Sequence, residues 1–236
     1  MRRTSPTAAH LEFLTQVLAI AAKDLSIERR SRERVLAAAA FSALVVLLFA
    51  LAFDRTGAGS RELAAPVIWM TLVFGGLLAV ARTFHLERED DALTGLLQSP
   101  APRDAIYLGK TLANAVVVFP LTTLVLVAFA LLFGTGFPTP PAFGLTLVAL
   151  SLGALAFVAH GTLLAVISTG ARSGDALLLV LVLPLAVPVV IFGVDAVSAS
   201  LAGRLAEAVP AIRWLGGFAL VSLFSGAVLF RYLVEE

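Results

Sequence analysis

The chain contains six long apolar stretches, and each is long enough to cross a lipid bilayer as a helix. Crossing the hydrocarbon layer takes about 20 consecutive apolar residues. Because lipid supplies no hydrogen-bond partners, a spanning segment has to satisfy its own backbone groups, and an α-helix does so. We therefore expect an all-α, polytopic membrane protein. The predicted spans lie near Val35–Phe53, Leu63–Ala81, Thr111–Phe133, Ala142–Ile167, Leu177–Val194 and Ile212–Phe230.

Composition supports this class of protein and excludes several functions. Charged residues make up 14% of the chain, against about 25% in soluble domains. Cysteine is absent, which excludes disulfides and thiolate metal sites. The sequence has no nucleotide-binding, nucleophile-elbow or metal motif, so we do not expect an enzyme or a stably bound cofactor. With no linker or internal repeat, residues 1–236 are expected to form one transmembrane domain.

Residues 10–30 are predicted to form an amphipathic helix that lies in the membrane interface. Its apolar residues recur at helical spacing, whereas polar residues occupy the opposite face. The apolar stripe is Leu11, Leu14, Leu18, Ala21 and Leu25, flanked by Phe13, Val17 and Ile20.

Lysine and arginine are distributed unevenly between the two sides of the predicted bundle. The N-terminal region, the loops after the second and fourth spans and the C-terminus hold 13 of the 17 basic residues, and the other connections hold 4. Basic residues concentrate in cytoplasmic loops, so both termini are expected in the cytoplasm. This topology signal also explains the cluster Arg29, Arg30, Arg32 and Arg34, for which we expect no nucleic-acid partner.

The cytoplasmic loop Phe84–Lys110 is the longest polar interruption between spans. Its acids suit the start of a helix, where carboxylates accept unpaired N–H groups, and Ser99-Pro100 ends that helix. We expect a short amphipathic helix near Asp90–Gln98. It either rests on lipid or docks on a soluble partner, and anionic lipid would repel its acidic face. The candidate partner-binding residues are Glu87, Glu89, Asp90, Asp91, Leu93, Leu96 and Leu97.

No Asp, Glu, Lys or Arg lies inside a predicted span. Ion-coupled carriers usually need such groups on their path, so energy for transport would have to come from another protein. His160 lies at depth, in line with the small residues Ala149, Gly153 and Ala156. We favour a structural role for His160 in a helix interface over the alternative, an axial ligand to a metallated tetrapyrrole.

The fifth span carries Pro184 and Pro188 one turn apart. Each proline removes a backbone donor and clashes with a carbonyl one turn earlier, which predicts a kinked or locally unwound helix. Because freed carbonyls are tolerated only against protein or water, we expect this helix to pack centrally or to move.

Two segments resemble the CcmB family, within the permease subunits of ABC-2-type exporters. The first, FHLEREDDALTGLLQSPAPRDAIYLGKTLAN (Phe84–Asn114), has the family's acidic start, leucine helix and Leu-x-Ser-Pro-x-Pro element. The second, LLLVLVLPLAVPVVIFG (Leu177–Gly193), resembles its double-proline helix. The family usually has a glycine in the acidic turn, where this chain has Asp91-Ala92.

The resemblance implies a membrane subunit of an ATP-driven transporter for cytochrome c maturation. Haem would be the cargo of the complex, and ATP would be bound by a CcmA-like cytoplasmic ATPase that holds the Asp90–Gln98 helix. CcmC-like and CcmD-like membrane subunits, a CcmE-like haem chaperone and a second copy of the chain are the other implied partners. The alternatives are an ABC-2-type permease for a lipid, glycan or drug, and a scaffold that transports nothing.

Overall fold

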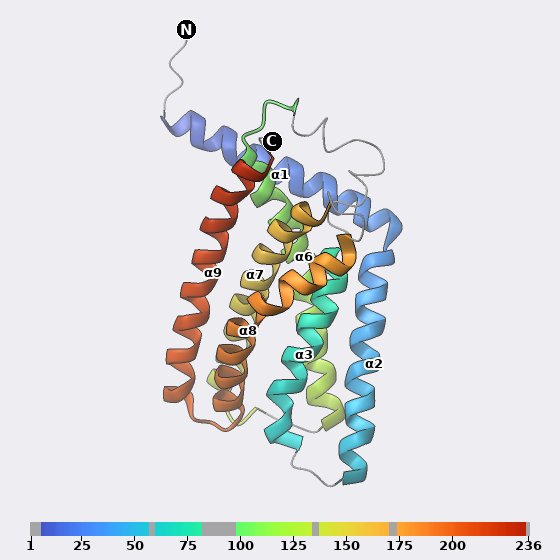
Figure 1. Ribbon diagram of the computed structural model, residues 1–236. Coiled ribbons are helices and arrows are strands. Elements are labelled where there is room, and N and C mark those ends of the chain that lie inside the picture. Colours follow the sequence, from blue (N-terminus) through green and yellow to red (C-terminus); the bar gives the residue numbers. More distant parts are fainter. Residues whose placement is uncertain (1–5, 57–59, 82–97, 134–136, 170–173, 235–236) are drawn as a thin grey trace.

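The computed structural model describes residues 6–56, 60–81, 98–133, 137–169 and 174–234. In these ranges every regular element is an α-helix, and six of the helices are long and apolar enough to cross a membrane, which confirms the predicted fold class. The helices, labelled in Figure 1, are α1 (Pro6–Ser31), α2 (Glu33–Thr56), α3 (Ser60–Ala81), α6 (Arg103–Phe133), α7 (Pro140–Thr169), α8 (Gly174–Leu201) and α9 (Leu205–Leu233).

Helix α1 lies across one end of a bundle that the other six helices form (Figure 1). We call this end the α1 end and the opposite one the distal end. The last turn of α9 also lies at the α1 end. Helix α7 packs against α3, α6, α8 and α9 and is therefore the central helix, whereas α2 packs mainly on α3 and α6.

The corner between α1 and α2 is made at Arg32. Its φ of 55° lies in the left-handed region, which non-glycine residues seldom adopt. The carboxylate of Glu28 accepts a hydrogen bond of 3.3 Å from the backbone N–H of Val35, in the first turn of α2. A helix-start N–H group is thereby satisfied, and the chain turns from the surface helix into the first span.

Two predicted boundaries are wrong. Helix α6 begins at Arg103, so the residues from there to Lys110, which we had assigned to the loop, are helical. Helix α6 has 31 residues, about 46 Å, which exceeds the hydrocarbon thickness of roughly 30 Å. The span therefore extends into the interface, where polar residues are tolerated, and hydropathy alone cannot find its start.

The second wrong boundary concerns the connection between the fifth and sixth spans, which we predicted to end near Val194 and to begin near Ile212. The structure continues α8 to Leu201 and starts α9 at Leu205. Gly203, with φ of 75°, turns the chain: its N–H bonds the Ser200 carbonyl at 3.0 Å, and the Arg204 N–H bonds the Ala199 carbonyl at 2.9 Å. This is a Schellman motif, which ends α8 at a left-handed glycine.

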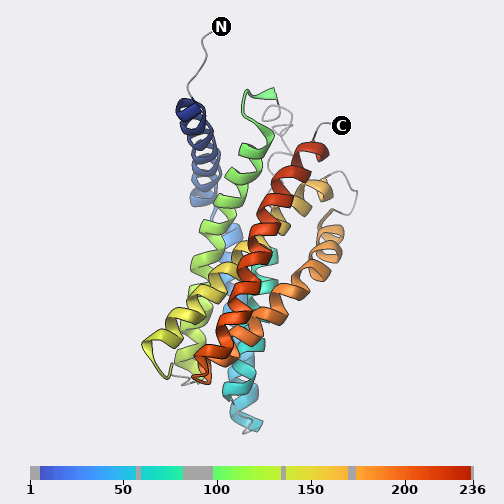
Figure 2. The ribbon, with the colours of Figure 1, turned by 90° about the vertical axis from the view of Figure 1, so that its left-hand side faces the viewer.

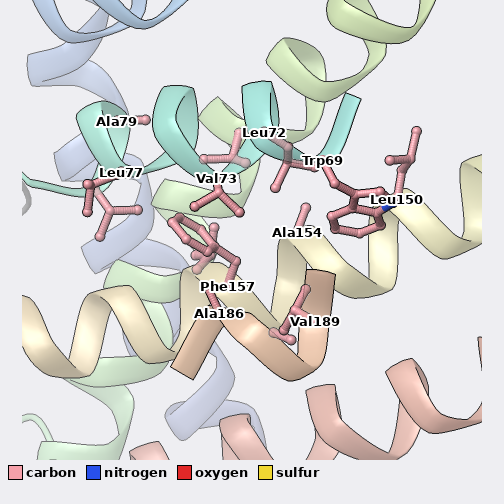
Figure 3. Close-up of a cluster of buried hydrophobic side chains, with 14 of the residues drawn as sticks. Trp69, Leu72, Val73, Leu77, Ala79, Leu150, Ala154, Phe157, Ala186 and Val189 are labelled. Carbon is pink, nitrogen blue, oxygen red and sulfur yellow. The ribbon is translucent and has the colours of Figure 1, made fainter. Parts of the chain in front are cut away.

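A tryptophan of α3 joins three helices in the core. Trp69 is fully buried, and Figure 3 shows it between Leu150 of α7 and Val189 of α8. Its ring lies directly against Gly153 of α7 and Gly193 of α8, where a Cβ atom would overlap it. Small residues let membrane helices approach closely, so these glycines provide the space for the indole.

Helix α8 stays helical through Pro184 and Pro188, and its axis changes direction in this part of the helix (Figures 1 and 2). The local unwinding that we considered is absent from the described helix. Pro184 is exposed and Pro188 is half-buried, so the side of α8 with the interrupted backbone hydrogen bonds faces partly away from this chain's own core.

We predict that Gly193→Ala destabilises the protein by about 1–3 kcal/mol, because the new methyl group would overlap the Trp69 ring. Gly217→Ala is the matched control on α9, since its Cβ would meet nothing within 4 Å. Alanine has a higher helix propensity than glycine, so this variant should be as stable as the parent protein or more stable. The measurement is unfolding in mixed detergent micelles. Equal stability of the two variants would contradict the packing of Trp69 on Gly193.

Candidate functional site

All seven predicted partner-binding residues lie outside the described residues: Glu87, Glu89, Asp90, Asp91, Leu93, Leu96 and Leu97. The structure describes what flanks them. Helix α3 ends at Ala81 and α6 begins at Arg103, both at the α1 end of the bundle (Figure 1). The candidate site is therefore built from the groups that hold the start of α6 in place.

The start of α6 is defined by its proline-rich approach. Residues 99–102 are not helical, as expected after Ser99-Pro100. Pro102 precedes the helix with a φ angle already suited to a first turn, and its carbonyl accepts a 3.2 Å hydrogen bond from the Ile106 N–H. Asp104 in the first turn places a negative charge at the positive end of the helix dipole.

The first half of α6 carries buried polar side chains on one side of the helix. They recur three or four residues apart, which places them on one face. These residues are Tyr107, Lys110, Thr111 and Asn114, all buried. A buried polar group is costly unless it is hydrogen-bonded, so the partners of this stripe determine how α6 is held.

Tyr107 fastens α6 to α7 and α9. Its hydroxyl donates a 3.0 Å hydrogen bond to the Ala159 carbonyl of α7. Its ring lies against Gly226 of α9, and its centroid is 5.8 Å from that of Phe230. One turn from Lys110 towards the distal end, Asn114 donates a 2.9 Å hydrogen bond to the Thr162 hydroxyl of α7. Both bonds tie α6 to the central helix.

Lys110 fastens α6 to α1. Its ammonium is 3.1 Å from an oxygen of Asp24, and the two side chains are 0% and 12% exposed. The other Asp24 oxygen is 3.2 Å from Lys23, which is 44% exposed. A charge removed from water needs a close partner of opposite charge, and the structure supplies one from another helix.

Sequence reasoning missed this ion pair. It counted Lys110 among loop residues and did not assign Asp24 to either face of the N-terminal helix. The signal was present in both places: Asp24 continues the helical row of Val17 and Ile20, and Lys110 lies between Tyr107 and Asn114 at helical spacing.

His160 is half-buried on α7, one residue from the carbonyl that Tyr107 binds. Its Nδ1 is 3.1 Å from the Ala156 carbonyl of the same helix, and its ring centroid is 5.3 Å from that of Phe218 on α9. These contacts are of the kind expected for the structural role that we favour, and neither that role nor the alternative, ligation of a tetrapyrrole metal, is tested by them. Within the described ranges, no three His, Cys, Asp or Glu side chains gather in a way that could hold a metal.

The distal end has a hollow of about 390 Å³ between α8 and α9. The rings of Phe192 and Trp214 stack there with centroids 6.0 Å apart, and Arg204 pairs with Glu207 at 2.8 Å. Tryptophan close to charged side chains is typical of helix ends near a membrane–water interface.

These features define a multi-pass helical membrane protein with a surface helix fastened to one end of its bundle. Residues 15–230 match the model of the CcmB protein family, and the chain belongs to this family.

Its relatives are similar over most of their length. Heme exporter protein B of Paracoccus denitrificans is 32% identical over 206 residues, 87% of this chain and 92% of the relative. That of Rhodobacter capsulatus is 33% identical over 190 residues, 80% and 85% of the two chains. That of Escherichia coli K12 is 28% identical over 198 residues, 83% and 88%.

We predict that Tyr107→Phe destabilises the protein by about 1 kcal/mol, the net contribution of one hydrogen bond, and that Tyr107→Ala costs about 3–5 kcal/mol by leaving a cavity. Tyr232→Phe is the control, since Tyr232 is 66% exposed, and its effect should be near zero. Denaturation in mixed micelles measures all three. A Tyr107→Phe variant as stable as the control would show that the bond to Ala159 contributes nothing.

Proposed function

We propose that this chain is the membrane permease subunit of an ATP-driven transporter of cytochrome c maturation. It would act in haem export or delivery, or in release of a haem-loaded chaperone, on the outer side of the membrane. The observation that carries the proposal is the family match over residues 15–230, together with relatives named heme exporter protein B. Haem is cargo in this proposal, and the ATP is bound and hydrolysed by a separate subunit.

The chain would lie in the inner membrane of a bacterial cell, and the proposed orientation places the α1 end in the cytoplasm. Its support is the positive-inside rule applied to the 13 basic residues on one side against 4 on the other. The distal end, with Gly203 in its α8–α9 turn, would face the periplasm, and both termini would be cytoplasmic.

The proposed ATPase contact is the acidic segment between α3 and α6. Its acids, Glu87, Glu89, Asp90 and Asp91, would pair with basic residues of a CcmA-like subunit, and Leu93, Leu96 and Leu97 would enter an apolar groove. This arrangement follows the helix-in-groove mode of recognition. It would pass force to the start of α6, because only the short non-helical stretch 99–102 separates Gln98 from Arg103.

Other membrane subunits would cover α8. A proline removes one helical hydrogen bond, so Pro184 and Pro188 deprive the carbonyls of residues 180 and 184 of their usual donors. Val180 and Pro184 are exposed on this chain. Since hydrocarbon cannot satisfy carbonyls, a second copy of the chain or a CcmC-like or CcmD-like subunit is the proposed neighbour there, and a CcmE-like chaperone would receive the haem.

Charge reversal of Glu89, Asp90 and Asp91 to lysine is expected to lower co-purification of the ATPase by more than about tenfold, because losing buried interface charges costs several kcal/mol. The chain should still insert into the membrane, while haem-loaded cytochrome c should fall in parallel. Asp195→Lys with Glu207→Lys is the control, since both acids are exposed at the distal end. Unchanged ATPase binding in the triple variant would refute the docking segment.

Orientation is tested with single cysteines, because the chain has none of its own. Ala202→Cys, exposed in the α8–α9 turn, should react with a membrane-impermeant maleimide in spheroplasts. Ala19→Cys, exposed on α1, should react only after the inner membrane is opened. The reverse pattern of labelling would overturn the proposed topology.

A further inference from the structure

The surface helix α1 is attached to the bundle chiefly through α6. Val17, Ile20 and Ala21 of α1 are buried, and Gly109 of α6 comes so close that a Cβ atom would lie 2.8 Å from Ile20 and 2.9 Å from the Val17 carbonyl. The ion pair between Asp24 and Lys110 adjoins this contact. Figure 2 shows α1 and α6 side by side at the end of the bundle.

An adjoining row of α1, on the same apolar face, is not buried against the bundle. Leu11, Leu14 and Leu18 are 55–62% exposed, and in an interfacial helix such a row enters the lipid headgroup boundary. We therefore expect α1 to contact lipid along the leucine row, while the adjoining row of Val17, Ile20 and Ala21 contacts α6. Apolar contacts such as Ile20 on Gly109 are non-directional, whereas an ion pair with little access to water also fixes the register of the two helices.

The Asp24–Lys110 ion pair occupies a helix contact that apolar side chains could also fill. Replacing a buried ion pair with apolar residues is often neutral or stabilising, so stability alone does not account for a fully buried lysine in α6. The pair lies about 10 Å along α6 from its first residue, Arg103, which is the described helix start nearest to the acidic segment.

We propose that Asp24 and Lys110 form a latch that makes α1 and the first two turns of α6 move as one unit. Force applied to the segment between α3 and α6 then shifts α1 in the membrane interface along with α6. Asp24 and Lys110 are positioning residues in this proposal, because they act through the two helices. The functional consequence rests on the proposed function, whereas the latch itself is a property of this chain.

The first test measures the latch by spin labels on the intact chain in lipid nanodiscs. Leu18→Cys on α1 and Leu112→Cys on α6 are exposed label sites. The distance distribution should be narrow in the parent protein and clearly broader in Lys110→Met. In that variant Asp24 retains Lys23 as a partner and some access to water, so the chain should still fold. Lys23→Met, which removes the exposed partner of the same carboxylate, is the control and should leave the distribution narrow.

The second test asks whether the latch matters for function, in the complex with the ATPase. Lys110→Met and Asp24→Asn should keep normal amounts of bound ATPase, while haem-loaded cytochrome c falls roughly two- to thirtyfold, the range for a change in coupling. Asp24→Glu, which retains the charge, should restore most of the yield. A purely structural role would lower the amount of complex and not the yield per complex.

The outcomes separate this proposal from the proposed function. A narrow distribution in Lys110→Met overturns the latch, whether or not an ATPase binds. Broadening with an unchanged cytochrome yield shows that the pair holds α1 without serving transport, and overturns its positioning role. Failure of the parent chain to bind any ATPase or to support cytochrome maturation refutes the proposed function, and leaves the label measurement to decide on the latch.

Discussion

The bilayer cannot satisfy polar groups, and this constraint explains where the chain places its polar residues. In the first half of α6, Tyr107, Lys110 and Asn114 are buried against other helices, and each has a partner from α1 or α7. They lie in the half of α6 nearer the α1 end (Figure 1). In the distal half of the bundle the helices are joined by apolar packing, of which Trp69 is the largest example.

The number of spans could be predicted from the sequence because hydropathy measures directly what lipid demands of a helix. The start of α6 could not be predicted, because polar residues that other helices cover look the same in a sequence as polar residues in a loop. Lys110 illustrates this: its exposure is decided by α1, which is distant in the chain. The outer turn was missed for another reason, since Gly203 could have belonged equally to a long loop or to a Schellman motif.

The candidate site could be predicted only in part. The acidic segment was identified by composition and by its resemblance to a family, and the described residues add the support around it. The ion pair and the hydrogen bond of Tyr107 also depend on which helices pack together, and the spacing within one helix does not identify the partner on another. Helical spacing does place Asp24 and Lys110 on helix faces that are otherwise apolar or buried. A charge on such a face is costly unless it is paired, which favours an ion pair between an acid and a base placed in this way.

The apolar packing around Trp69 and the polar bonds at the α1 end have different mechanical consequences. Trp69 fills the space above Gly153 and Gly193 so closely that α3, α7 and α8 cannot slide past one another without repacking, which is costly in a densely packed core. At the α1 end, directional bonds join α6 to α1 and α7. We therefore expect a force on the start of α6 to tilt the packed helices rather than to slide them past Trp69, and in our proposal the Asp24–Lys110 pair determines whether α1 follows.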